Sequence, residues 1–289
     1  MKQKNFVIVR TVNGIKYASF IHKEINIKGY RCFTSDIYNL KKLLKNEKLF
    51  HRNTIIHTRT AHPGFVYKTL KKLESQGYSI INQPETIRLT SQKYLSCKYM
   101  LKNNLPCAET VKIKKELALD FVKKNLDKWG KVIVKPLTSK GQGEHAYCFW
   151  KENLNELKNI LTIPSGEVIC QEYIKYYRLS RVIVIGNKAL SDCVFYDEPG
   201  KGWKCSVCLN PKIKLYKNPP EELLNLAEKT AQIFGSEISF IDIFSTEKGL
   251  VLNEINTACS LIIHERISKI NISKHIAKYL LSKANKESA

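Results

Sequence analysis

Two apolar segments decide the fold, ISFIDIF (residues 238–244) and LVLNEIN (residues 250–256). Both are rich in β-branched and aromatic residues, and the short turn between them predicts an antiparallel strand pair. Asp242 interrupts the first segment, whereas Glu254 and Asn256 interrupt the second and share one face, because side chains alternate along a strand. Burying such carboxylates is unfavourable without a partner or a metal. The pattern therefore predicts a Mg²⁺ site of three oxygen donors, and a solvated edge strand is the alternative.

The first third of the chain alternates between strand-like and helix-like segments. This alternation predicts an α/β fold that begins with a parallel, doubly wound sheet. The turn at residues 82–84 marks the end of that unit. The expected strands are residues 6–9, 53–57 and 78–81, and the expected helices are residues 36–44 and 63–76.

The remaining segments predict two further lobes. A hairpin with a glycine-rich tip dominates the second lobe, and the metal strands lie in the third. We expect three domains, an N-terminal α/β lobe (1–84), a central lid (85–170) and a C-terminal lobe (171–289). The other expected helices are residues 90–103, 116–128, 220–234 and 270–283, and the other expected strands are residues 131–135, 146–150, 168–174, 181–185 and 188–194.

Composition narrows the class of protein. No apolar run approaches the roughly 20 residues that cross a bilayer, and the apolar stretch after the N-terminus is too short for a signal peptide. We expect a cytoplasmic protein with no membrane partner. The nine cysteines are irregularly spaced, which favours reduced thiols. Cys205 and Cys208 form one C-x-x-C pair, which lacks the second pair of a structural zinc site.

The net charge of +22 admits three interpretations. A nucleic-acid partner is one, and a lysine-rich genome composition is another. The third is attraction of anionic ligands such as nucleotides or acidic peptides. Because the lysines are scattered and do not form one stripe, we do not expect nucleic-acid binding.

A second set of residues predicts contacts with a nucleotide. Lys135 ends a strand and precedes a loop that contains Ser139, Gly141 and Gly143, and such loops bring backbone amides close to phosphates. An ordinary hairpin tip is the alternative. The strand end 171–174 (QEYI) offers polar groups to the edge of a base and an apolar side to its face.

Taken together, these motifs resemble the ATP-grasp superfamily, and most closely its RimK-type branch, which is named for the ribosomal-protein glutamate ligase. The resemblance extends over nearly the whole chain and rests on the order of its motifs. These are TSQK (90–93), VKP (134–136) with its glycine loop, QEYI (171–174), RVIVIG (181–186), and Asp242 with EIN (254–256).

The resemblance implies a site, a reaction and partners. Lys93 and Lys135 would hold the phosphates of ATP, with the loop 139–143 folded over them. Gln171, Glu172, Tyr173 and Ile174 would surround the adenine, and Arg181 would face the phosphates or an acyl-phosphate. Asp242, Glu254 and Asn256 would bind Mg²⁺ or Mn²⁺.

Members of the family join a carboxylate to an amine through an acyl-phosphate, with metal ions and cations neutralising the transferred phosphoryl group. The expected substrates are ATP, an amino acid such as glutamate, and a peptide, protein or small metabolite. A ligase that crosslinks peptides and a non-catalytic nucleic-acid-binding protein are the alternatives. A homo-oligomer stays open.

Some positions depart from the family pattern. Leu179 replaces an acidic residue expected near the ribose, and Lys204 and Ser206 stand where arginine and asparagine are usual. Cys259-Ser260 replaces a Pro-Gly pair after the metal strand. These changes bear mainly on substrate choice.

Three other segments have both a functional and a plain interpretation. His57, Arg59 and His62 lie at a strand end, where α/β sites form, and Arg59 could meet a substrate carboxylate, although a solvated loop fits equally well. The segment 176–178 (YYR) could stack on a base, but a packed linker is favoured. The segment 264–266 (HER) reads as a helix start with exposed charge.

Overall fold

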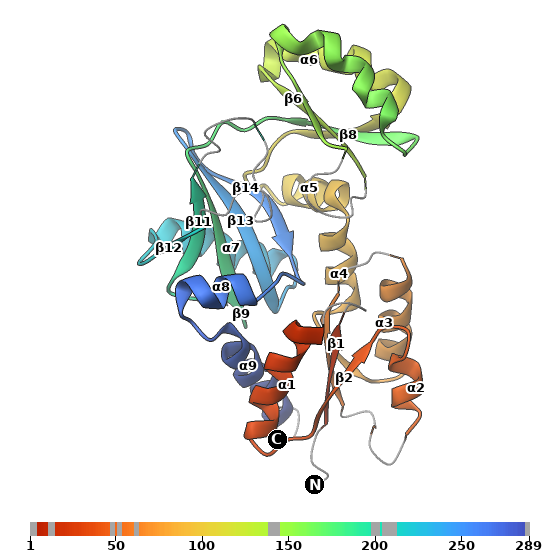
Figure 1. Cartoon of the computed structure of the whole chain (residues 1–289), viewed down its shortest axis with the longest axis vertical. Coiled ribbons are helices and arrows are strands. Elements are labelled where there is room, and N and C mark those ends of the chain that lie inside the picture. Colours follow the sequence, from red (N-terminus) through yellow and green to blue (C-terminus); the bar gives the residue numbers. More distant parts are fainter. Residues whose placement is uncertain are drawn as a thin grey trace.

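The chain forms three sheets in three lobes, seen in a computed structural model (Figure 1). The structure describes residues 5–10, 15–46, 50, 54–60, 64–137, 145–197, 203 and 213–286. The N-terminal lobe lies at the bottom of Figure 1, a small lobe lies at the top, and the C-terminal sheet lies between them on the left. The mixed α/β class predicted from the sequence is confirmed.

The N-terminal sheet is parallel, as the alternating pattern predicts. Its strands follow the order β2-β1-β3-β4. The elements are β1 (Phe6–Arg10), α1 (Ile15–Ile27), β2 (Cys32–Asp36), α2 (Leu40–Leu44), β3 (Ile55–Arg59), α3 (Phe65–Ser75) and β4 (Ser79–Ile81).

Two elements of this lobe were not predicted, α1 and β2. The helix expected from residue 36 begins only at Leu40, because Asp36 ends β2 and its Oδ1 accepts hydrogen bonds from the backbone N–H groups of Tyr38 and Asn39 at 2.9 Å. This local turn takes the place of the first helical turn.

Two helices follow where the sequence predicts one. They are α4 (Pro84–Ser91) and α5 (Lys93–Lys102), separated by Gln92 in an extended conformation. Proline at the start of α4 suits a first helical position. Met100 of α5 and Leu105 contribute to the core of the C-terminal lobe, so this segment packs away from the lid sheet.

The lid sheet is antiparallel, in the order β5-β8-β6-β7. Val122, Leu126 and Trp129 of α6 pack against it in a core of its own. The elements are β5 (Thr110–Lys114), η1 (Lys115–Leu117), α6 (Ala118–Trp129), β6 (Val132–Pro136), β7 (Tyr147–Phe149), η2 (Lys151–Thr162) and β8 (Glu167–Glu172).

The C-terminal sheet contains the two apolar segments 238–244 and 250–256. Its order is β12-β11-β9-β13-β14, with β10 paired to β9. The elements are β9 (Arg178–Ile185), β10 (Lys188–Ala189), β11 (Cys193–Asp197), β12 (Lys214–Tyr216), α7 (Glu221–Ile233), β13 (Ile238–Thr246), β14 (Gly249–Asn256), α8 (Ile262–Ser268) and α9 (Ile272–Lys286).

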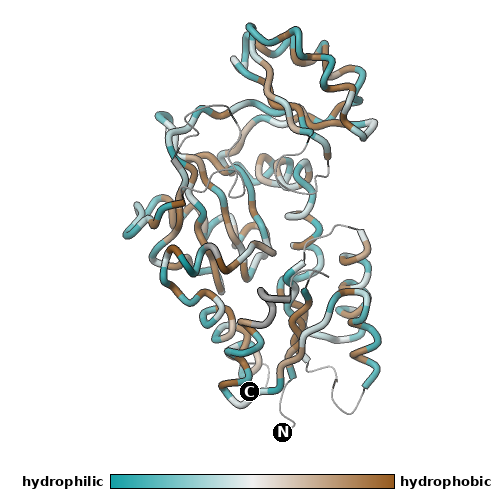
Figure 2. Tube along the Cα trace, in the orientation of Figure 1, coloured by the Kyte–Doolittle hydropathy of each residue, from teal (hydrophilic) through white to brown (hydrophobic). Residues whose placement is uncertain are grey.

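The N-terminal and C-terminal lobes share one hydrophobic core. Phe6, Ile21 and Ile25 of the first lobe pack in one cluster with Phe240 and Ile276 of the last. In Figure 1, α9 runs beside α1, and Figure 2 shows the apolar residues concentrated in the strands. None of the described helices has the length and apolar character needed to cross a membrane.

Candidate active site

The three predicted metal ligands lie on neighbouring antiparallel strands. Asp242 of β13 pairs with Glu254 of β14 on one side and with Arg181 of β9 on the other. Residues paired in this way point to one face of a sheet. Asn256 lies two positions beyond Glu254 and therefore shares that face, and a β-bulge beside Asp242 sets this register. The strand pair thus gathers two carboxylates and one amide.

Arg181 and Asp242 form a bidentate ion pair inside the sheet. Arg181 Nε and Nη2 donate to the two carboxylate oxygens of Asp242 at 2.5 and 2.6 Å. The pair raises the pKa of Arg181. Burial raises the pKa of Asp242, the arginine opposes that rise, and the nearby Glu254 adds to it. The Arg181 guanidinium therefore holds the Asp242 carboxylate in one orientation next to Glu254.

Lys135 brings the lid sheet to the same site. Its Nζ donates to Gln171 Oε1 at 2.7 Å, across the β6–β8 pair. Burial and repulsion by Lys93 together lower its pKa to about 8, and Cys97 and Glu254 partly oppose this change. The two predicted phosphate-binding lysines and a predicted metal ligand are therefore close enough to influence one another, although they come from three separate elements.

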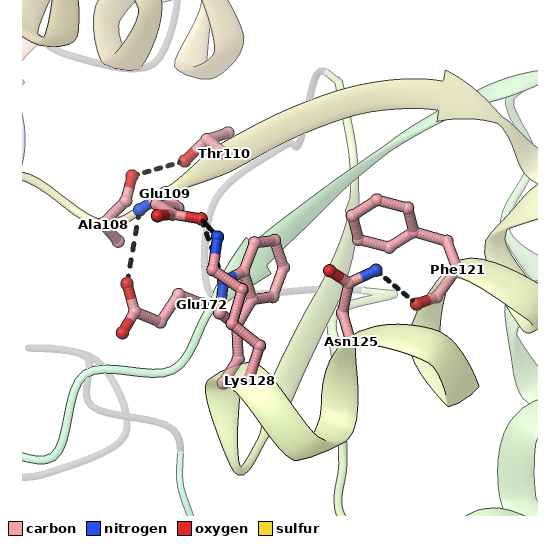
Figure 3. A network of polar contacts seen from close by, with 8 residues as sticks. Ala108, Glu109, Thr110, Phe121, Asn125, Lys128 and Glu172 are labelled. Atoms are coloured by element: carbon pink, nitrogen blue, oxygen red, sulfur yellow. Dashed lines mark hydrogen bonds and ion pairs between the residues drawn. The ribbon is translucent and has the colours of Figure 1, made fainter.

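The strand end proposed for adenine lies at the edge of the lid. Glu172 Oε2 accepts from the backbone N–H of Glu109 at 3.5 Å, and Figure 3 shows Glu109 in turn beside Lys128. Tyr173 and Ile174 are partly buried, and Lys131 Nζ lies 5.3 Å from the centroid of the Tyr173 ring. Gln171 is 7% exposed and is held by protein hydrogen bonds.

Several predicted residues lie outside the described part of the chain. They are Ser139, Gly141 and Gly143 of the glycine loop, Lys204 and Ser206, Cys205 and Cys208, and His62. Leu179, in place of the family's acidic residue, is described. It is 3% exposed and packs with Tyr176 and Phe244 in a small apolar cluster.

The sequence did not predict how two segments meet at this site. Arg59 is only 5% exposed, so the solvated-loop interpretation of this residue is wrong. Its guanidinium donates to the carbonyl oxygens of Thr257 and Cys259 in the loop after β14. His264 is 1% exposed, contrary to the expected exposed helix start, whereas Arg266 is exposed as expected. The Arg59 contacts depend on docking of the first lobe against the last, which residue spacing does not encode.

Comparisons with known proteins identify the family. A family model described as the RimK-like ATP-grasp domain matches residues 90–280, more than half of the chain. The chain belongs to the RimK-like ATP-grasp family.

Individual relatives of this ATP-grasp ligase extend the match. The α-aminoadipate–LysW ligase LysX of Sulfurisphaera tokodaii is 26% identical over 253 residues, 85% of this chain and 86% of that protein. The tetrahydromethanopterin:α-L-glutamate ligase of Methanocaldococcus jannaschii is 26% identical over 214 residues, 70% of each chain.

A solved structure supports the fold. The ATP-grasp ligase PsnB, complexed with minimal precursor, Mg and ADP, matches with a TM-score of 0.71 and 13% identity, over 97% of this chain and 98% of PsnB. ATP-grasp ligases join carboxylates to amines with ATP and a divalent metal, and this chain is such a carbon–nitrogen ligase.

The residues of this ATP-grasp ligase fit a divalent cation. Asp242 and Glu254 face each other across the strand pair, and their mutual repulsion would be relieved by a cation between them. Oxygen donors suit Mg²⁺ or Mn²⁺. No described group of three His, Cys, Asp or Glu side chains could hold a metal, so the amide oxygen of Asn256 would be needed as the third ligand.

Proposed function

We propose that this ligase adds a glutamate-like amino acid, through its amine, to a carboxylate on a peptide, protein or small metabolite. The γ-phosphate of ATP passes to the acceptor carboxylate to give an acyl-phosphate and ADP. The amine then attacks the acyl carbon, the C–O bond to phosphate breaks, and an amide, phosphate and a proton are released.

The observation that supports this proposal is the electrostatic influence of Lys93 and Glu254 on the pKa of Lys135, together with the ion pair of Arg181 and Asp242. Phosphoryl transfer requires positioning and charge neutralisation more than covalent help from the protein. Lys93 and Lys135 supply positive charge for the phosphates. Asp242, Glu254 and Asn256 would hold Mg²⁺, which would neutralise the charge that develops on the transferred phosphoryl group.

The substrate class is supported by two relatives. Their names give α-aminoadipate with LysW as substrates of one, and tetrahydromethanopterin with L-glutamate as substrates of the other. Both name an acidic amino acid. The net charge of +22 favours anionic substrates through long-range attraction.

A substrate screen with product mass tests this function. The protein is incubated with ATP, Mg²⁺, each amino acid and a set of acidic peptides, and phosphate release is followed. We expect release to rise with an acidic amino acid plus an acceptor, and the product to gain one amino-acid residue. A product that has only lost water would instead identify a peptide-crosslinking ligase. Salt-sensitive binding to DNA or RNA without phosphate release would contradict the proposal.

A further inference from the structure

Four side chains near the contact of the first and last lobes carry buried polar atoms with no hydrogen-bond partner in the described part of the chain. They are Arg59 (Nε), Thr257 (Oγ1), Ser260 (Oγ) and His264 (Nε2), here called the Arg59 cluster. Buried polar atoms are bonded in the great majority of cases. Four such atoms in neighbouring segments therefore indicate a binding site for a polar ligand.

Arg59 supplies unused hydrogen-bond donors. It ends β3, and among the described residues its hydrogen bonds are the two to backbone carbonyls in the loop after β14. A guanidinium has five N–H donors in a planar fork that matches a carboxylate. Among the described residues no carboxylate lies within ion-pair distance of Arg59, in contrast to Arg181, which is paired with Asp242. Burial lowers the pKa of Arg59 to about 10, and Cys259 and Glu265 only partly oppose that change.

His264 supplies an acceptor. Its Nδ1 lies 2.8 Å from the carbonyl oxygen of Ser260, so Nδ1 carries the proton and donates. Burial and two nearby arginines lower the pKa of His264 to about 4, which keeps the ring neutral near pH 7. In that state Nε2 holds a lone pair, and an N–H donor would satisfy it.

The Arg59 cluster lies beside the candidate metal site. Arg59 stands over the ring of Phe240 at 5.4 Å, and the centroid of that ring is 6.0 Å from the His264 ring. Phe240 pairs with Asn256, one of the three expected metal ligands. The charges of Arg181 and Arg59 both lower the pKa of His264, so the ring lies within electrostatic reach of both arginines.

The arrangement is held rigidly. Ile55, four residues before Arg59, and Leu261, three residues before His264, belong to the hydrophobic core that the first and last lobes share. Donors and acceptors fixed in this way bind a ligand without a large ordering cost.

We propose that the Arg59 cluster binds the free amino-acid substrate, with the Arg59 guanidinium on its α-carboxylate and His264 Nε2 accepting a hydrogen bond from its amine. Thr257 and Ser260 offer hydroxyl groups to the same ligand. The amine is then presented next to the metal site, where the acyl-phosphate forms. This inference rests on the proposed function and adds the residues that hold the α-carboxylate and the amine of the amino acid.

Three small probes separate the two contacts. L-Glutamate carries both groups, 4-aminobutyrate lacks the α-carboxylate, and glutarate lacks the amine. Binding of each is measured by calorimetry in the presence of Mg²⁺ and a non-hydrolysable ATP analogue. For the unaltered protein we expect each analogue to bind about 10- to 100-fold more weakly than L-glutamate, the loss typical of one charge-assisted contact.

Two variants should respond differently. Arg59→Gln should reduce L-glutamate affinity to that of 4-aminobutyrate and leave 4-aminobutyrate itself nearly unchanged. His264→Asn keeps a donor for the Ser260 carbonyl and removes the Nε2 acceptor, so it should reduce L-glutamate affinity towards that of glutarate. Arg88→Gln, which removes a surface arginine paired with Glu85, is the control and should change none of the three affinities.

The outcomes are distinct. Equal weakening of all three probes by Arg59→Gln, with a lower melting temperature, would mean that Arg59 only joins the lobes, and it would overturn the inference. Absence of L-glutamate binding to the unaltered protein would overturn it as well. Binding of the ATP analogue is recorded in the same samples, so loss of nucleotide binding would count separately against the proposed function.

Discussion

Replacing Lys135 by methionine separates the effect of its buried charge on the free energy of unfolding from its role in nucleotide binding. Its pKa falls from 10.5 to about 8. Because each pKa unit is worth about 1.4 kcal/mol, the folded protein holds the charged lysine at a cost of about 3 kcal/mol. The variant loses that cost, but Gln171 Oε1 loses its donor, which costs about 1–3 kcal/mol. The free energy of unfolding without nucleotide should therefore stay constant or rise by up to about 2 kcal/mol.

The pH dependence has a definite sign. In the unfolded chain Lys135 keeps its proton up to about pH 10.5, whereas in the folded protein it loses the proton above about pH 8. The unfolded state binds more protons between these values, so this residue makes the protein more stable as pH rises through the window. Nucleotide affinity should fall over the same rise, because a neutral amine no longer attracts phosphate. The variant should show neither effect.

Urea unfolding near pH 7 and near pH 9.5 measures the stabilities, and thermal shift with Mg²⁺ and a non-hydrolysable ATP analogue measures binding. Lys229→Met, on the exposed face of α7, is the control. The reasoning is refuted if Lys135→Met lowers the free energy of unfolding by more than about 2 kcal/mol and keeps the full nucleotide-induced shift.

Two further predictions concern the framework of the site. Arg181→Met and Asp242→Leu should each lower the free energy of unfolding by about 3–5 kcal/mol, because each leaves a buried charge unpaired. The double variant should lose less than the sum of the two single losses. Additive losses in urea unfolding would contradict this coupling. Gly186→Ala should lower the melting temperature more than Gly130→Ala. Both glycines have positive φ, but a Cβ at Gly186 would lie 2.6 Å from Cε2 of Tyr279, whereas nothing lies within 4 Å of one at Gly130. The clash should add about 1–3 kcal/mol, and equal losses would contradict it.

The metal strands were predictable because the signal is local. Asp242, Glu254 and Asn256 interrupt apolar runs, and the alternation of side chains along a strand fixes their faces. The pairing of Asp242 with Arg181 was not predictable from either segment alone, because it depends on which strand becomes the other neighbour of β13.

The less predictable parts depend on tertiary contacts. The helix α1 lacks a clear start signal in the sequence, yet Ile21 and Ile25 hold it against α9 through the shared core. Local polarity suggested exposure for His264, but tertiary packing buries it beside Phe240 of β13. A local sequence pattern predicts which face of a helix or strand is apolar, but it does not predict which distant segment packs against that face.

Mg²⁺-dependent ADP formation in Glu254→Gln tests the central claim most directly. This substitution keeps the shape of the side chain and leaves the Arg181–Asp242 pair intact. A change at Asp242 would also leave the buried charge of Arg181 without its partner. Loss of a metal ligand worth several kcal/mol predicts a fall of more than about 100-fold at saturating ATP, with an unchanged melting temperature. Glu247→Gln, exposed at the turn between β13 and β14, should keep full activity. Equal rates of ADP formation in Glu254→Gln and the unaltered protein would contradict the assignment of this strand pair as the metal site.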